Sequence, residues 1–297
     1  MQRFVITSLD VTVNTTPCAI ALGNFDGVHL AHQALLDQTQ KTEYIPAVFT
    51  FSEAVSNFLT TPDERAEKIQ KQGIQFLFLA SFSLIQNMSC EEFVLFLKEK
   101  LACHHVICGF NFHFGKGAAG DSQTLSSLAT QHGMTCTVLS QVKKQEDTVS
   151  SSRIRALLAE GDIQTANTLL GSPYSVTGIV QKGYSIGRRL QVPTINLPIS
   201  QNAAPICYGV YISRTQIDGV SYPSITNIGK NPTFDRSAVT CETYLLDTCG
   251  DFYEKKVTVQ LLSFLRKEKR FESFDALKNA IEQDLVSARS FHQTHKE

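Results

Sequence analysis

The sequence lacks the features that mark membrane-bound, secreted and nucleic-acid-binding proteins. No apolar run approaches the length of a membrane-spanning helix, and the first ten residues contain no apolar signal-peptide core. The formal net charge of the 297 residues is only −1, so no excess of charge of either sign points to nucleic acid or to an anionic membrane. We therefore expect a cytoplasmic protein that binds neither, and in which a local site holds any anionic ligand.

Metal-binding cysteine pairs are also missing from the sequence. The chain contains eight cysteines but no Cys-x-x-Cys, and most of them stand in apolar, strand-like runs that suit reduced, buried thiols. One cluster, residues 103–108 (CHHVIC), has metal-ligating residue types. If this segment is a strand, its side chains alternate between two faces and cannot all meet one metal. We therefore expect no metal site there.

The first half of the chain alternates between strand-like and helix-like patterns. Alternation of this kind, with apolar strands, favours a parallel sheet covered on both faces by helices. Such folds bind ligands at the carboxyl ends of their strands. The expected strands are residues 19–22, 45–51, 74–80, 105–109 and 135–139, and the expected helices are residues 32–42, 63–72, 90–101 and 122–132.

The pattern changes near residue 170, where strand-like segments begin to dominate. They are residues 174–180, 210–217, 221–228, 240–246 and 256–264, and one helix follows at 273–290. The pair Asp218-Gly219 between two of these segments is a strong hairpin signal. Consecutive strands followed by one helix predict a small antiparallel β-barrel with a helix packed on it. We expect an N-terminal domain over 1–158, a helical linker over 159–172 and a C-terminal domain over 173–297.

The most informative segment is residues 23–32 (GNFDGVHLAH), which follows the first apolar strand and precedes a helix. A turn between a strand and a helix presents backbone N–H groups and the positive end of the helix dipole to a phosphate. His29 and His32 add side-chain donors there, which could stabilise the charge that develops when a triphosphate is split. A lone His-x-x-His is more often a loop with two solvated histidines, but the complete string favours the phosphate site.

Two further motifs in the first half contain residue types that suit phosphate binding. Residues 115–120 (GKGAAG) match Gly-x-Gly-x-x-Gly, but they do not follow the first strand and no acidic residue lies about twenty positions later. A dinucleotide-binding fold is therefore not favoured. Residues 150–155 (SSSRIR) place hydroxyl groups at a helix start beside Arg155, where they could cap the helix or bind phosphate.

Residues 23–32 resemble the GNFDGVHxGH pattern of the bacterial FAD synthetases, which are HxGH-type nucleotidyltransferases, except that Ala31 replaces a glycine. Residues 109–121 and 150–155 resemble two further motifs of that family. Its Phe-x-Pro-His-Pro, on the flavin side of the site, is absent, and the chain reads FTFSEAV at 49–55.

The resemblance implies a Rossmann-like α/β N-terminal domain in which His29 and His32 are catalytic. The residues that it implies for binding ATP and its phosphates are Gly23, Asn24, Phe25, Asp26, Gly27, Asn111, Ser151, Ser152 and Arg155.

The second half resembles a riboflavin kinase. Residues 183–196 resemble GxxxGRxLGxPTAN, and Gly183, Gly187 and Arg188 are the ATP-binding positions that this implies. Thr194 and Asn196 retain oxygen ligands that suit Mg²⁺ bound to ATP phosphates, although a plain Pro-Thr turn is the alternative.

Residues 240–247 resemble VExHLLDF, which implies that Glu242 is the general base for the ribityl hydroxyl. Burial would raise the pKa of this carboxyl group and make it a better base. A salt-bridged structural glutamate is the alternative.

These motifs occur in one order over about residues 15–292, and the chain is identified as a member of the bifunctional riboflavin kinase/FAD synthetase family. The resemblance implies that the C-terminal barrel converts riboflavin to FMN and that the N-terminal domain converts FMN to FAD and pyrophosphate, each with ATP. Ala31 and the absent Pro-His-Pro motivate an alternative, a riboflavin kinase with a degenerate N-terminal domain. A non-catalytic flavin-binding or flavin-delivery protein is a second alternative. The oligomeric state stays open.

Overall fold

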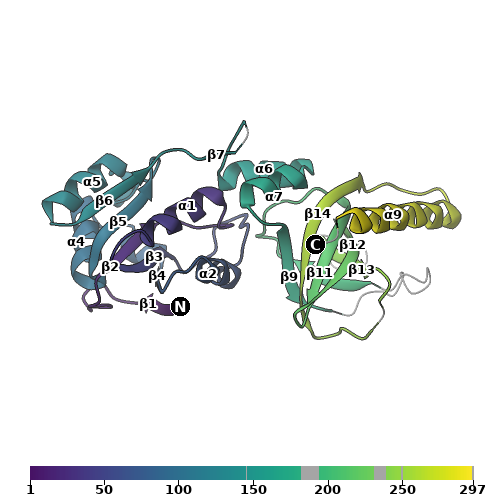
Figure 1. Ribbon diagram of the computed structural model, residues 1–297, viewed down its shortest axis with the longest axis horizontal. Helices are drawn as coiled ribbons and strands as arrows, with labels where there is room; N and C mark the ends of the chain where they lie inside the picture. Colours follow the sequence, from purple (N-terminus) through teal and green to yellow (C-terminus); the bar gives the residue numbers. More distant parts are fainter. Residues whose placement is uncertain (145, 182–193, 231–238, 249, 296–297) are drawn as a thin grey trace. The chain divides into compact units, whose positions relative to one another are not determined.

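The computed structural model describes residues 1–144, 146–181, 194–230, 239–248 and 250–295 (Figure 1). The contacts divide the chain into two units, Met1–Ser151 and Ser152–Glu297, and each unit has its own six-stranded sheet. Over the ranges just given, no helix is both long enough and apolar enough to cross a membrane.

The first unit is a parallel sheet with helices on both faces, as the alternating pattern predicts. Its strands are β1 (Gln2–Ile6), β2 (Cys18–Leu22), β3 (Ile45–Phe51), β4 (Phe76–Ala80), β5 (Cys103–Gly109) and β6 (Thr135–Leu139). Helices α1 (Leu30–Thr39) and α2 (Pro62–Lys71) pack on one face, and α4 (Cys90–Leu101) and α5 (Ser122–Gln131) pack on the other. Shorter elements are α3 (Phe82–Ile85), a 3-10 turn (Lys116–Ala118), β7 (Lys143–Lys144) and β8 (Asp147–Thr148).

Local sequence explains where these helices begin. Helix α4 starts at a capping box, in which the backbone N–H of Glu92 donates to the Ser89 hydroxyl at 3.2 Å and the N–H of Ser89 donates to the Glu92 carboxylate at 2.7 Å. Thr61 and Glu64 form the same arrangement at the start of α2. Each box satisfies two backbone donors that a helix end otherwise leaves without partners.

The order of the strands reverses next to β2, and this reversal creates a crevice. The six parallel strands lie in the order β1-β4-β3-β2-β5-β6. The chain moves from β2 outward through β3 and β4, and then returns to β5 on the other side of β2. Crevices at the carboxyl ends of such neighbouring strands are where open α/β sheets bind ligands. Residues 23–32 follow β2 and residues 110–121 follow β5, so two of the predicted motifs meet there.

The second unit is an antiparallel barrel with one long helix, which confirms the fold class expected for the second half. Its strands are β9 (Tyr174–Ile179), β10 (Ile195–Ile199), β11 (Gly209–Ile217), β12 (Val220–Lys230), β13 (Val239–Leu245) and β14 (Lys256–Lys267). They lie in the order β10-β13-β12-β11-β14-β9, and a bridge between Gln181 and Asn196 nearly closes the barrel. Asp218 and Gly219 both have positive φ and form the expected hairpin turn. Helix α9 (Phe274–Thr294) packs against β11 and β12.

Two helices precede the barrel and belong to its unit, apart from Ser151 at the start of the first one. The helical segment between the two sheets is divided at Gly161, which has a φ of 90°, into α6 (Ser151–Glu160) and α7 (Ile163–Leu170). The Asn167 amide on α7 donates to the carbonyl of Leu261 on β14 at 2.8 Å and accepts from the N–H of Tyr174 at 2.7 Å. Helix α7 is therefore bonded to the neighbouring strands β14 and β9, at one end of the sheet order.

Candidate active sites

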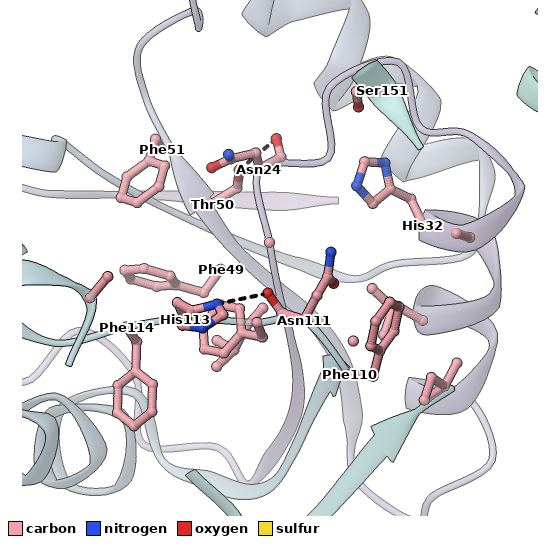
Figure 2. Close-up of a pocket in the computed structure, with 18 of the residues that line it drawn as sticks. Asn24, His32, Phe49, Thr50, Phe51, Phe110, Asn111, His113, Phe114 and Ser151 are labelled. Carbon is pink, nitrogen blue, oxygen red and sulfur yellow. Dashed lines mark hydrogen bonds between the residues drawn. The ribbon is translucent and has the colours of Figure 1, made fainter. Parts of the chain in front are cut away.

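A cavity of about 710 Å³ lies at the carboxyl ends of β2 and β5 in the first unit. A volume in this range suits a small-molecule ligand of drug or nucleotide size. Figure 2 shows His32, Asn24 and Ser151 in the upper part of the view and the Phe110 and Phe114 rings in the lower part. Six residues that the sequence predicts for this site line the cavity together: Gly23, Asn24, His29, His32, Asn111 and Ser151.

The two histidines stack at the N-terminus of α1. Their ring centroids are 3.7 Å apart and their planes differ by 11°. His29 is the N-cap residue, and its Nδ1 accepts a hydrogen bond from the backbone N–H of His32 at 3.3 Å. A neutral His29 ring therefore carries its proton on Nε2. The first turn of α1 contains no acidic side chain, so no carboxylate there offsets the positive end of the helix dipole.

His32 is held in its neutral form. The pKa of His32 lies well below its usual value. Burial is the largest cause, and the neighbouring His29 and Arg65 add to it. Its Nδ1 is buried and has no hydrogen-bond partner in the described part of the chain. A buried polar atom without a partner costs stability. The Phe25 ring packs against His32 with its centroid 5.0 Å away.

Three residues expected to bind phosphate shape the loop instead of lining the cavity. Phe25 is fully buried, and both Phe25 and Gly27 have positive φ. Asp26 is only 3% exposed, and its carboxylate accepts hydrogen bonds from the backbone N–H groups of Leu59, at 2.9 and 3.0 Å, and Thr60, at 3.1 Å. The N–H of Gly27 donates to the Thr60 hydroxyl at 3.0 Å. These contacts tie the loop between β2 and α1, residues 23–29, to the segment that precedes α2. This loop is called the histidine loop below.

An aromatic wall forms the other side of the cavity, and sequence analysis missed it. Phe82 and Phe110 remain 56% and 49% exposed. Phe51 packs edge-to-face on Phe82 with ring centroids 5.4 Å apart. A flat heteroaromatic ring would bury this exposed surface. The phenylalanines that line the cavity are Phe49, Phe51, Phe82, Phe93, Phe110, Phe112 and Phe114.

A second cavity, of about 540 Å³, lies between one face of the barrel and α9 in the second unit. Thr194 and Glu242 line it. Asn196 on β10 stands opposite Glu242 on β13, so these side chains share one face of the sheet. The Asn196 amide donates to the carbonyl of Thr194 at 3.3 Å. The structure thus brings together the three residues predicted for the metal and the general base.

Glu242 has the electrostatic environment expected of a general base. The pKa of Glu242 lies above its usual value. Burial is the main cause, and the nearby Glu268 carboxylate is the second. Glu268 is exposed and lines the same cavity. A carboxyl group whose pKa is closer to neutral accepts a proton more effectively at physiological pH.

A partly buried ion pair holds α9 against the barrel at the wall of this cavity. Arg266 Nε donates to both carboxylate oxygens of Asp284 at 3.0 Å, and its Nη2 donates to Oδ2 at 2.7 Å. The Phe271 ring lies 5.7 Å from the Arg266 guanidinium carbon. This bidentate geometry fixes the helix rotation more firmly than a single contact would.

The remaining predicted residues lie elsewhere. Ser152 is exposed and Arg155 partly exposed on α6, in the second unit. Gly183, Gly187 and Arg188 lie outside the described residues.

Comparison with known proteins matches each half of the chain to a family. The family model described as FAD synthetase matches residues 11–153, and the one described as Riboflavin kinase matches residues 170–292. The bifunctional riboflavin kinase/FMN adenylyltransferase of Pseudomonas fluorescens is 33% identical over 288 residues, which cover 92% of each chain. Its counterpart in Listeria monocytogenes is 31% identical, over 92% of this chain and 91% of that protein.

A solved structure shares the fold over nearly the whole length. It is named as a macrolide-efflux protein from Streptococcus pneumoniae, and it matches with a TM-score of 0.87 at 26% identity, over 97% of this chain and 98% of that chain. The efflux activity in that name has no counterpart in either matching family model. On the identity and coverage of its relatives, this chain belongs to the bifunctional riboflavin kinase/FMN adenylyltransferase family.

Proposed function

We propose that the two cavities divide the two reactions of this family between the two units of the chain. The enzyme phosphorylates riboflavin with ATP to give FMN, and it transfers AMP from ATP to FMN to give FAD and pyrophosphate. We assign adenylyl transfer to the first cavity, because the FAD synthetase model covers residues 11–153. We assign phosphorylation to the second cavity, because the riboflavin kinase model covers residues 170–292.

In adenylyl transfer, a phosphate oxygen of FMN attacks the α-phosphorus of ATP and pyrophosphate leaves. Negative charge then grows on the α-phosphate and on the leaving group. We assign His29, His32 and the N-terminus of α1 to that charge, because they present preorganised donors at the cavity wall. Neutral rings can stack closely without the repulsion that two imidazolium ions would have.

The polar and the aromatic residues of the first cavity suit different parts of the two substrates. We assign Asn24, Asn111 and Ser151 to the nucleotide, because they are the polar lining residues predicted for it. The phenylalanines that line the same cavity suit the flavin ring. Phe25, Asp26 and Gly27 act on the nucleotide indirectly, by fixing the loop that carries the histidines.

In the second cavity, we assign Glu242 to the proton of the ribityl hydroxyl that attacks the γ-phosphorus of ATP. Thr194 and Asn196 would hold Mg²⁺, which neutralises phosphate charge when it is bound. The described part of the chain has no cluster of three or more His, Cys, Asp or Glu residues able to hold a metal. A hydroxyl and an amide oxygen beside one carboxylate therefore fit an ion whose other ligands are ATP phosphates and water.

We also propose that the enzyme works in the cytoplasm on small molecules without engaging nucleic acid. The net charge of −1 supports this, because it provides no electrostatic attraction to a polyanion.

The observation that carries the proposal is the His29–His32 stack at a helix N-terminus in a nucleotide-sized cavity. The test incubates the full chain with riboflavin, ATP and Mg²⁺ and separates the flavins by chromatography. The native chain should give FAD, whereas His29→Ala and His32→Ala should accumulate FMN at a normal rate. His104→Ala is the matched control, because His104 is exposed and does not line the cavity.

Three results would contradict parts of this proposal. FAD formation by both histidine variants at the native rate would remove the histidines from the reaction. Accumulation of FMN by the native chain would mean that its adenylyltransferase site is degenerate. Unchanged riboflavin would leave only flavin binding.

A further inference from the structure

A buried arginine connects the two sides of the first cavity. Arg65 lies on α2 and is 3% exposed. Its guanidinium donates to the carbonyl oxygen of Asn24 at 3.1 Å and also to the carbonyl oxygen of Phe51. Asn24 belongs to the loop that carries the histidines, and Phe51 ends β3 on the aromatic side. Arg65 itself does not line the cavity.

Placing a charge at this position is costly. Burial lowers the pKa of Arg65, although the carboxylates of Asp26 and Glu53 partly offset that effect. An apolar side chain of similar size would avoid the desolvation cost. An arginine remains charged even so, and its rigid planar fork donates to the two carbonyl groups in a fixed geometry that a lysine ammonium does not impose. The distinctive property of Arg65 is therefore the bridge between Asn24 and Phe51.

Other contacts make the bridged loop rigid. The carbonyl of Asn24 accepts a second hydrogen bond, from the Thr50 hydroxyl at 3.1 Å (Figure 2). Asp26 binds the backbone of Leu59 and Thr60, just before the helix that carries Arg65. The start of α2 thus holds the histidine loop at two points, one through Asp26 and one through Arg65.

We propose that Arg65 is a positioning residue for adenylyl transfer, which sets the separation between the histidine loop and the aromatic end of β3. The proposal rests on the assignment of the first cavity to that reaction. When the attacking phosphate and the α-phosphorus belong to two bound substrates, their alignment depends on how the two sides of the cavity are held. A misplacement of about 1 Å can cost about 10²-fold in rate.

The test compares Arg65→Lys, Arg65→Met and Lys71→Met in the full chain. Lys71 is an exposed cation on the same helix and serves as the matched control. Both Arg65 variants should lower kcat for FAD formation by about 10- to 100-fold, with a much smaller change in the KM for ATP. Lys71→Met should behave as the native chain. Riboflavin phosphorylation, measured in the same samples, should keep its native rate in all three variants.

The pKa of His32 is a second measurement, which distinguishes the effect of the positive charge of Arg65 from the effect of its two hydrogen bonds. Arg65 is one of the groups that lower the pKa of His32, so an NMR titration of His32 should show a higher pKa in Arg65→Met but not in Arg65→Lys. Loss of kcat in both variants, with a changed pKa in only one, supports the bridge. Native kcat in Arg65→Lys would overturn it, because charge alone would then suffice. If Arg65→Met unfolds the first unit, the lysine variant decides.

The remaining outcomes are also decisive. A raised KM with native kcat would make Arg65 a contributor to ground-state binding and overturn the positioning role. A parallel loss of riboflavin phosphorylation would reduce Arg65 to general stability and overturn it as well. If the histidine variants still make FAD, the site assignment fails. If the histidine variants make no FAD while Arg65→Lys and Arg65→Met form it at the native rate, only the proposed role of Arg65 fails.

Discussion

Replacement of Glu242 by glutamine tests the chemistry of the second cavity within one polypeptide. Glutamine preserves the shape of the side chain but cannot take the proton of the ribityl hydroxyl. Loss of a general base costs on the order of 10²- to 10⁴-fold in rate, which corresponds to about 2.7 to 5.4 kcal/mol in activation free energy. FAD formation from supplied FMN should stay native, because residues of the first unit line the cavity that we assign to it.

The same substitution should stabilise the folded protein at neutral pH. Burial and Glu268 raise the pKa of Glu242, so the folded state binds this proton more tightly than the unfolded chain. The ionised carboxylate therefore costs stability above the raised pKa, and that cost disappears below the unfolded-state value of about 4.3. The free energy of unfolding of Glu242→Gln should exceed that of the native chain near pH 7.5, and the excess should vanish near pH 4.

The assay measures initial rates of FMN formation from riboflavin between pH 5 and 9, together with urea unfolding at the two pH values. Glu272→Gln is the control, because Glu272 is an exposed glutamate of the same unit. Glu268→Gln removes the neighbouring negative charge, so it should lower the pKa of Glu242 and move the acid limb of the rate profile to lower pH. A native rate of FMN formation in Glu242→Gln would refute the general-base role. An equal stability difference at both pH values would refute the raised pKa.

Two further predictions concern space and domain boundaries. Ala31 lines the first cavity and lies in α1 without a positive φ. Ala31→Gly should therefore lower the KM for ATP in FAD formation, while it costs about 1 kcal/mol of helix stability. An unchanged KM would show that the methyl group is already accommodated. A fragment of residues 152–297 should fold and phosphorylate riboflavin. Its free energy of unfolding should exceed that of a 173–297 fragment by several kcal/mol, because α7 buries Ile163, Leu169 and Leu170 and each buried Leu or Ile contributes roughly 1.5–3 kcal/mol. Equal midpoints in urea would contradict the second expectation.

The fold could largely be predicted because hydrophobic periodicity reports burial. Apart from the two-residue strands β7 and β8, the strands that it missed are β1 and β10, and both lie at sheet edges. Strand β1 lies at one edge of the parallel sheet, and three of its five residues are exposed. Strand β10 lies at one end of the order in the barrel and contains Pro198. Edge strands tolerate polar residues and proline, so their sequences lack the apolar pattern that identifies central strands.

The position of the first site could be predicted, but the division of roles within it could not. The string at residues 23–32 correctly indicated a loop between a strand and a helix. The burial of the Asp26 carboxylate depends on Leu59 and Thr60, more than thirty residues later in the chain. Arg65 stands in a helix whose charged sequence gives no sign of a buried guanidinium. Local strings identify neighbours along the chain, whereas these roles depend on contacts between distant segments.

The loop that departs from the family pattern Phe-x-Pro-His-Pro is held by tertiary contacts. The Glu53 carboxylate accepts a hydrogen bond from the N–H of Phe82 at 3.3 Å, while the Phe51 carbonyl accepts from Arg65 and the Phe51 ring packs on Phe82. Prolines restrict φ by their own covalent rings, so a loop that contains them needs fewer outside contacts. In this chain α2 and the start of α3 must supply that restriction. The geometry of the flavin side therefore depends on side chains outside the cavity, and substitutions at Arg65 or Glu53 should alter adenylyl transfer without touching either substrate.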